Sequence, residues 1–217
     1  MPLVDSVVLM GDPAVARVPV EECDEPLVNA GDLFMMSDLK MQDEPHRSWL
    51  RAAVMERLRA AQTHLPDGYQ LCWVEGLRTS DLQASYFNTY HDQLIESEPH
   101  LSARESYLKA SRYVSPPEIA PHVSGAAIDL TLCDPDGNEL DLGSPVNASP
   151  EDSEGACYFD ALVNAEARRH RSILRDALIE VGVVNYPTEW WHWSYGDRYW
   201  ALMTGRAAAI YGPTTTP

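Results

Sequence analysis

Residues 122–132 read HVSGAAIDLTL, and this stretch predicts the central strand of the fold. From Ala126 onward it is apolar and rich in residues that favour extended backbone. Successive side chains of a strand point to opposite faces, so the Ile and Leu residues at 128, 130 and 132 share one face. That face is expected to pack into the core, and Asp129 is expected to point the opposite way.

Asp129 is the unusual residue of this strand. A carboxylate within so apolar a run costs several kcal/mol unless it is paired, hydrogen-bonded or bound to a cation. Residues 119–139 contain no Lys or Arg. The partner of Asp129 must therefore come from elsewhere in the chain, and a divalent metal ion is one candidate.

Two imidazoles are candidates to join Asp129. His122 precedes it by seven residues, with Gly125 between them to let the backbone turn closely. His192 lies in residues 188–193, TEWWHW, which hold three of the six Trp residues. Large aromatic rings exclude water and strengthen the effect of a nearby charge or metal ion. Taken alone, the aromatic stretch equally fits a core cluster with a capped Glu and a hydrogen-bonded His.

Two imidazoles, one carboxylate and an open fourth position are what a catalytic zinc site requires. Glu189 then remains as a base close to the metal. Residues 189 and 192 would face opposite sides of a regular strand, so Glu189 is expected in a turn or bend after Pro187. Each residue taken singly also fits an ordinary structural role, and the combination carries the hypothesis.

The composition limits the partners of the protein. The chain has 217 residues, 16 of them basic and 33 acidic, for a formal net charge of -17. Phosphate backbones and anionic lipid surfaces would be repelled, so neither nucleic acid nor a membrane is an expected partner.

The first ten residues contain no Lys or Arg, which disfavours a secretory signal and makes a cytoplasmic location the expectation. The four Cys residues lie far apart and are interpreted mainly as small buried residues. The oligomeric state stays open.

The chain length fits one domain over residues 1–217. Residues 1–45 are rich in Pro, Asp and Glu and predict an irregular arm packed on that domain, with a short strand near 33–36. Helical spacing from His46 predicts a helix that ends before Pro66, and residues 69–74 predict a buried strand. Further helices are predicted over about 80–96, 102–112 and 159–181. Ser80 with Gln83, and Ser102 with Glu105, have the form of capping boxes.

The pattern HxxGxAxD at 122–129, followed by ExWH at 189–192, resembles the zinc D-alanyl-D-alanine dipeptidases and carboxypeptidases. The resemblance is greatest to the dipeptidase branch associated with vancomycin resistance. Residues 75–78 (EGLR) with Gln83, residues 128–132 (IDLTL) and residues 140–144 (LDLGS) support it. It runs from about Leu50 to Tyr199 in matching order.

This resemblance implies a fold, a cofactor and roles for individual residues. The fold would be α+β, with a small antiparallel sheet that carries the zinc site and is flanked by helices. His122, Asp129 and His192 would bind one Zn²⁺ per chain, and the strands that carry Asp129 and His192 would be neighbours. Glu189 would be the general base, and Arg78 would stabilise the oxyanion of the scissile carbonyl. The alternative for Arg78 is an ordinary surface or ion-pair arginine.

The resemblance also assigns substrate contacts, and two positions depart from the family pattern. Ala120 stands where the family has a Ser that contacts the substrate. Asn147 stands where family dipeptidases place an Asp that holds the free ammonium of the substrate, so the charge of that contact is missing here. Trp191 is a third candidate contact. The departures leave the catalytic residues in place and put substrate recognition in doubt.

Three functions follow as alternatives. The first is zinc-dependent hydrolysis of a dipeptide, D-Ala-D-Ala above all. The second keeps the same zinc chemistry and directs it at another small peptide, such as a peptidoglycan fragment or a specialised metabolite. The third is a zinc-binding module without turnover, against which Glu189 and Arg78 argue because neither is needed to hold a metal ion.

Overall fold

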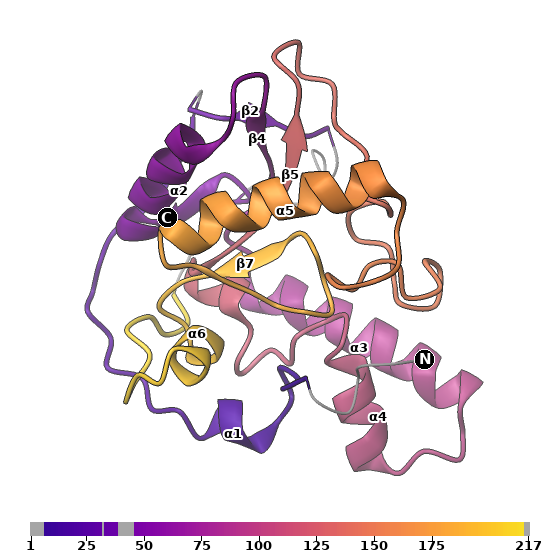
Figure 1. The fold of residues 1–217 in the computed structure, drawn as a ribbon. Coiled ribbons are helices and arrows are strands. Elements are labelled where there is room, and N and C mark those ends of the chain that lie inside the picture. The colour runs from indigo at the N-terminus through magenta and orange to yellow at the C-terminus, as the bar shows by residue number, and fades with distance from the viewer. Residues whose placement is uncertain (1–6, 32, 39–45, 215–217) are drawn as a thin grey trace.

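The computed structural model describes residues 7–31, 33–38 and 46–214. Its centre is a five-stranded sheet in the order β2-β4-β5-β7-β6 (Figure 1). The strands are β2 (Met35–Met36), β4 (Gln70–Glu75), β5 (Ala127–Cys133), β6 (Val184–Asn185) and β7 (His192–Ser194). Strands β4, β5, β7 and β6 pair antiparallel, and β2 joins β4 in parallel at one edge.

Strand β5 lies in the middle of this sheet, and every one of its residues is buried. Trp73 of β4 is paired with Leu130, and Asp129 is paired with His192 of β7. The prediction that the strands carrying Asp129 and His192 are neighbours is therefore confirmed. The face of β5 that carries Asp129 is also covered by protein, which the alternation of residue types alone did not predict.

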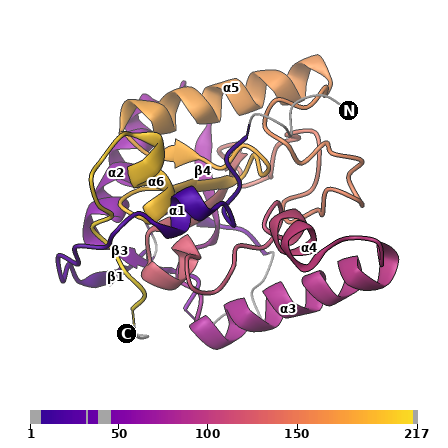
Figure 2. The ribbon, with the colours of Figure 1, turned by 90° about the horizontal axis from the view of Figure 1, so that it is seen from below.

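Helices cover both faces of the sheet, as Figures 1 and 2 show. Helices α2 (Ala52–His64) and α5 (Ala165–Glu180) pack against each other and, through Leu58 and Leu174, against the core around Leu130 and Trp193. Helices α3 (Ser80–Ser97) and α4 (Ala103–Ala110) form a hairpin on the other side of the strands, with an aromatic cluster of their own. The predicted α+β fold, with a small and mainly antiparallel sheet flanked by helices, is confirmed.

The remaining short elements lie outside the central sheet and pair with each other. Strands β1 (Leu27–Asn29) and β3 (Trp49–Arg51) form a separate antiparallel pair, and α1 (Pro13–Ala16) packs on α6 (Arg198–Met203). The described residues of the predicted arm over residues 1–45 contain three short elements, of which only the strand near 33–36 was predicted. Residues 1–6, 32 and 39–45 of that arm, and most of the Thr-rich tail, lie outside the described part of the chain.

Several predicted helix starts are wrong, each for a local reason. The first long helix begins at Ala52 instead of near His46, because residues 49–51 pair with β1. Helix α3 is capped by Thr79, whose hydroxyl accepts a hydrogen bond from the backbone of Leu82, and not by Ser80. Helix α5 begins at Ala165, where the side chain of Asn164 caps it. The capping box of Ser102 with Glu105 is confirmed.

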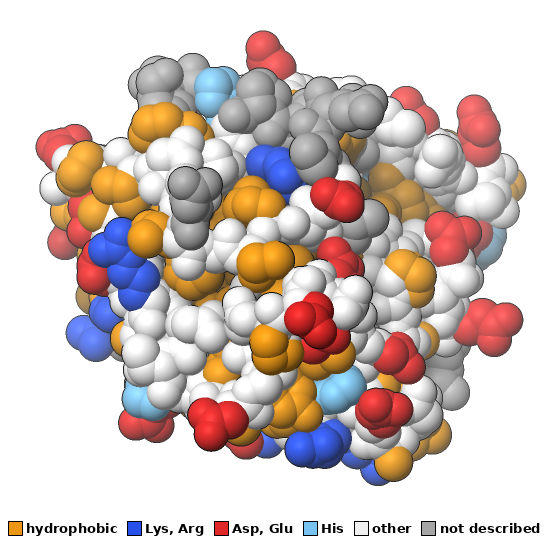
Figure 3. All heavy atoms as spheres, turned by 90° about the horizontal axis from the view of Figure 1, so that it is seen from above, with side chains coloured by type: hydrophobic (Ala, Val, Ile, Leu, Met, Phe, Trp, Pro, Cys, Tyr) orange, Lys and Arg blue, Asp and Glu red, His pale blue; other side chains and the backbone are white. Residues whose placement is uncertain are grey.

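Acidic side chains are spread over the face seen in Figure 3, in keeping with the net charge of -17. Within the described residues, no helix combines the length and the apolar character that a membrane span needs. All four Cys residues are free; Cys72, Cys133 and Cys157 are buried as predicted, whereas Cys23 is exposed.

Candidate metal centre

Three elements bring His122, Asp129 and His192 together. Asp129 and His192 face each other across β5 and β7, and His122 lies in the short 3₁₀ helix η2 (Pro121–Ser124) that leads into β5. Gly125 ends this helix in the left-handed region, with φ of 68°. The positive φ strains any residue other than glycine here, and a Cβ atom at Gly125 would lie 2.6 Å from Leu27 Cδ2, so the Leu27 side chain would have to move.

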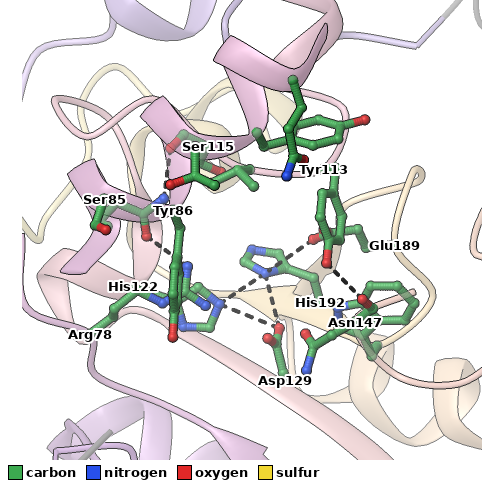
Figure 4. A pocket seen from close by; sticks show the side chains of 16 residues that line it. Arg78, Ser85, Tyr86, Tyr113, Ser115, His122, Asp129, Asn147, Glu189 and His192 are labelled. Atoms are coloured by element: carbon green, nitrogen blue, oxygen red, sulfur yellow. Dashed lines mark hydrogen bonds and ion pairs between the residues drawn. The ribbon is translucent and has the colours of Figure 1, made fainter. Parts of the chain in front are cut away.

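The ligand atoms of the three residues form a nearly equilateral triangle (Figure 4). His122 Nε2 lies 3.2 Å from His192 Nδ1 and 3.4 Å from Asp129 Oδ1, and His192 Nδ1 lies 3.1 Å from the same oxygen. Ligands at about 2.0–2.1 Å from a tetrahedral Zn²⁺ are separated from each other by roughly 3.3 Å. The spacing therefore fits one zinc-sized ion.

Hydrogen bonds at the far side of His122 support the same interpretation. His122 Nδ1 lies 2.6 Å from the carbonyl oxygen of Gly76, which can only accept, so Nδ1 carries the proton. The lone pair of a neutral His122 is then on Nε2, which faces Asp129 and His192. Metal-binding histidines are usually oriented in this way by a group behind them. This donor set would suit a divalent cation bound between the three atoms.

Burial and mutual contact shift the protonation of Asp129 and His192. Burial alone would raise the pKa of Asp129, but the two imidazoles, His122 first, hold it well below its usual range. Burial lowers the pKa of His192, and the hydrogen bond with Asp129 only partly opposes this. Asp129 is therefore a carboxylate, and His192 is held toward its neutral form, which are the protonation states that bind metal ions.

Glu189 lies beside the triangle because the chain turns after Pro187. Its backbone N–H donates to Tyr186, and its carbonyl accepts from the backbone of His192 at 3.3 Å. The turn places Glu189 Oε2 at 3.7 Å from His192 Nδ1, with the side chain almost buried. The expectation that Glu189 sits in a turn is confirmed, and the turn brings its carboxylate to the same side as the ligands.

These groups lie in the wall of a cavity of about 450 Å³. Figure 4 shows His122, Asp129 and His192 converging on one side of it, with Glu189 next to them and Arg78 near His122. The other lining residues come mainly from α3, from the segment after α4 and from the loop near 147. They are Gln83, Ser85, Tyr86, Thr89, Tyr90, Gln93, Tyr113, Val114, Ser115, Asn147 and Trp191.

Arg78 enters the cavity from the loop after β4. Its Nε and Nη2 atoms donate to the two carboxylate oxygens of Glu75 at 2.5 and 2.6 Å, and Nη1 donates to Gln83 at 2.8 Å. The guanidinium also lies over the ring of Tyr86, 5.0 Å from its centroid. Arg78 is thus ion-paired and buried, and it faces the cavity instead of lying on the surface.

The predicted substrate contacts divide into two groups. Asn147 and Trp191 line the cavity, and Asn147 adopts a left-handed conformation with φ of 61°. Ala120 is buried at the start of η2 and is not among the described residues that line the cavity. Of the three Trp rings expected around the site, only Trp191 lines it; Trp190 and Trp193 pack in the core.

Two contributors were not found from the sequence. Glu75 was quoted only as part of a motif, although its spacing of three residues from Arg78 was a usable signal. Tyr113 lines the cavity and donates from its hydroxyl to the backbone carbonyl of Asn147 at 2.7 Å. Burial, with the charge of Glu189 adding to it, raises the pKa of Tyr113 to about 12, so this hydroxyl stays a donor.

A buried His-Asp-His set with a carboxylate beside it, at the wall of a cavity, is an arrangement used by hydrolases with one catalytic metal ion. Comparison with known proteins specifies the family. Residues 36–206 match the family model Peptidase_M15, described as D-ala-D-ala dipeptidase. The chain therefore belongs to this family of metallopeptidases, and the resemblance found in the sequence is confirmed.

Two curated relatives are named D-alanyl-D-alanine dipeptidase. The protein of Synechocystis sp. is 33% identical over 89 residues, covering 37% of this chain and 36% of the relative. The Escherichia coli protein is 38% identical over 71 residues, covering 33% of this chain and 35% of the relative. The matched part thus spans about a third of the length of these relatives. Among solved structures, the LdcB LD-carboxypeptidase is similar with a TM-score of 0.44 and 17% identity, over 84% of this chain and 75% of that one.

Proposed function

We propose that this protein uses one bound Zn²⁺ to hydrolyse a small peptide, with the dipeptide D-Ala-D-Ala as its first candidate substrate. The observation that carries the proposal is the triangle of ligand atoms from His122, Asp129 and His192 with Glu189 directly beside it. The family membership and the names of the relatives support the substrate class.

The residues around the triangle supply the acid-base and electrostatic parts of the reaction. When bound, Zn²⁺ lowers the pKa of a coordinated water to about 7 and polarises a carbonyl oxygen. Glu189 accepts the proton of the attacking water and passes it to the leaving amine. Arg78 donates toward the oxygen on which negative charge develops, and its guanidinium does so without titrating.

Hydrogen bonds from neighbouring residues fix the positions of Glu189, His192 and Arg78. Asn185 donates from its side-chain amide to the backbone carbonyls of both Glu189 and His192, at 2.9 Å each, and so fixes the turn between the base and a ligand. Glu75 and Gln83 fix the guanidinium of Arg78. Such preorganisation avoids rearrangement during the reaction.

A different small peptide is the second candidate, and Asn147 favours it. An amide at this place in the cavity offers hydrogen bonds but no charge for a substrate ammonium. A peptidoglycan fragment or a specialised metabolite with a blocked amino end would suit such a contact. A zinc-binding module without turnover is the least favoured alternative, because Glu189 and Arg78 both face the cavity.

The test combines metal analysis with a panel of dipeptides. The purified protein is expected to hold about one zinc per chain, and His122→Ala is expected to lose it. The panel varies chirality at each position and blocks the amino end, with D-Ala-D-Ala as the reference. Hydrolysis that requires zinc supports the proposal and ranks the two substrate candidates, whereas a zinc-loaded protein that cleaves none of the peptides contradicts it.

A further inference from the structure

The two histidines of the candidate metal centre differ in what lies behind them. His122 Nδ1 has the carbonyl of Gly76 as its partner. His192 Nε2 is buried, and none of the described residues offers it a hydrogen bond. A buried polar atom without a partner costs roughly 1–3 kcal/mol, and metal-binding histidines almost always donate from the nitrogen that does not bind the metal. His192 therefore requires an acceptor.

Asp197 has a buried acceptor oxygen without a hydrogen-bond donor, the counterpart of the unpaired nitrogen of His192. Its Oδ1 atom accepts from the backbone N–H groups of Tyr199 and Trp200 at 2.7 and 3.2 Å, and so caps helix α6. Its Oδ2 atom is buried and has no hydrogen-bond partner within the described residues. An unpaired carboxylate oxygen in a buried place is costly. Asp197 therefore requires a donor.

The two side chains share one buried region. His192 and Ser194 point to the same face of β7, and the Ser194 hydroxyl lies close enough to Asp197 to lower its pKa by a hydrogen bond. The ring of Tyr186 packs against His192, and that of Tyr199 packs against Tyr186, with centroids 6.1 and 5.2 Å apart. Aromatic rings thus shield this region.

A single buried water can serve as the hydrogen-bond partner of both His192 Nε2 and Asp197 Oδ2. No ion pair or hydrogen bond joins His192 to Asp197 directly, and a water molecule between them would give both unpaired atoms a partner. Buried waters in proteins typically make about three hydrogen bonds to polar groups that otherwise lack partners. A water between these side chains has His192 Nε2–H as donor and Asp197 Oδ2 as acceptor, and the Ser194 hydroxyl is available as a third partner.

We propose that Asp197 is the positioning residue of His192, acting through one buried water that accepts from His192 Nε2–H and donates to Asp197 Oδ2. The inference rests on the proposed metal site, since it assigns Nδ1 of His192 to the ion. The bridge holds the proton on Nε2, so the lone pair stays on Nδ1 and faces Asp129 and His122. It also fixes the rotation of the ring and increases its basicity.

The test is the zinc affinity of Asp197 variants, measured by competition with a chromophoric chelator. Asp197→Ser keeps a hydroxyl that can cap α6 but removes Oδ2, and we expect zinc binding to weaken by about 10–100-fold. Asp12 is the matched control, because its side chain likewise caps a helix, by accepting from Ala14 at 2.7 Å. Asp12→Ser is expected to keep the zinc affinity of the parent.

A second variant and a structural measurement keep the test decisive. Asp197→Asn retains the cap and removes only the charge, so it replaces Asp197→Ser if that variant does not fold; about tenfold weaker binding is expected. A crystal structure of the zinc-loaded protein should show a water between His192 Nε2 and Asp197. Parent-like zinc affinity in the folded variants, or another partner on His192 Nε2, overturns the inference. A parent that binds no zinc contradicts the proposed function instead.

Discussion

Glu75 and Arg78 form a bidentate ion pair three residues apart, with both side chains buried at the wall of the candidate active site. The carboxylate of Glu75 is completely inaccessible to solvent, and its two oxygens lie 2.5 and 2.6 Å from Nε and Nη2 of Arg78. The chain contains an exposed counterpart, Arg59 with Glu56, at the same spacing and with a contact of 2.5 Å. The two pairs separate the effect of burial from the effect of sequence spacing.

Replacing one member of the buried pair should affect both stability and catalysis. Glu75→Gln leaves the charge of Arg78 buried without its carboxylate, which costs about 3–5 kcal/mol of unfolding free energy. Arg78 should also lose its fixed orientation, so kcat should fall while zinc content stays that of the parent. Denaturant unfolding and steady-state kinetics measure the two effects.

Glu56→Gln is the matched control for this prediction. Its pair with Arg59 is exposed and screened by solvent, so about 0.5 kcal/mol or less should be lost, without change in kcat. Equal effects of the two substitutions would show that burial does not give the Glu75–Arg78 pair its importance.

Arg171 is expected to hold the loop that carries Asn147. From α5 it donates to four backbone carbonyls, those of Leu142, Ala156, Tyr158 and Phe159, at 2.6 to 2.9 Å. Burial lowers its pKa to about 10, so it remains charged at neutral pH. Arg171→Met removes all four donors, and each buried carbonyl left unpaired costs roughly 1–3 kcal/mol.

The expected result is a loss of several kcal/mol of stability, with faster amide hydrogen exchange in residues 142–159. Arg175→Met on the same helix is the control, because Arg175 is exposed and, among the described residues, pairs only with its neighbour Asp176. Unchanged exchange in the loop of Arg171→Met would show that the loop is held by other contacts.

The four thiols should differ in reactivity. Burial raises the pKa of Cys72 to about 12 and that of Cys157 to about 11, and it also raises the pKa of Cys133. Because the thiolate is the reactive form, these three residues should resist a maleimide at pH 7, whereas exposed Cys23 should react quickly. Mass spectrometry should find one modified residue in the folded protein and four after unfolding. Rapid modification of two or more thiols in the folded state contradicts the burial of Cys72, Cys133 and Cys157.

The sequence predicted those parts of the fold that local patterns determine. The alternation in residues 126–132 located β5, and the turn after Pro187 followed from the positions of Glu189 and His192 alone. Strand β3 was assigned to a helix because its partner β1 lies more than twenty residues earlier in the chain. The start of α5 was placed too early because residues 159–163 are partly apolar and the cap comes from Asn164.

The sequence predicted the three candidate metal ligands, but it did not predict the residues that pack around them. His122, Asp129 and His192 have a recognisable spacing, and the structure brings their ligand atoms together. The hydrogen bond of Tyr113 to the carbonyl of Asn147, and the proximity of Asp197 to His192, depend on tertiary packing between segments without a shared pattern. Such contacts leave no periodic signal in the sequence.

The central claim is that Glu189 is the base of a zinc-dependent peptide hydrolysis, and Glu189→Gln tests it most directly. The substitution keeps the size of the side chain and leaves His122, Asp129 and His192 unchanged. Zinc content and zinc affinity of Glu189→Gln should match those of the parent, while kcat for the best peptide of the panel falls by about 10²–10⁴-fold. A zinc-loaded Glu189→Gln protein that hydrolyses this peptide at the rate of the parent would contradict the account.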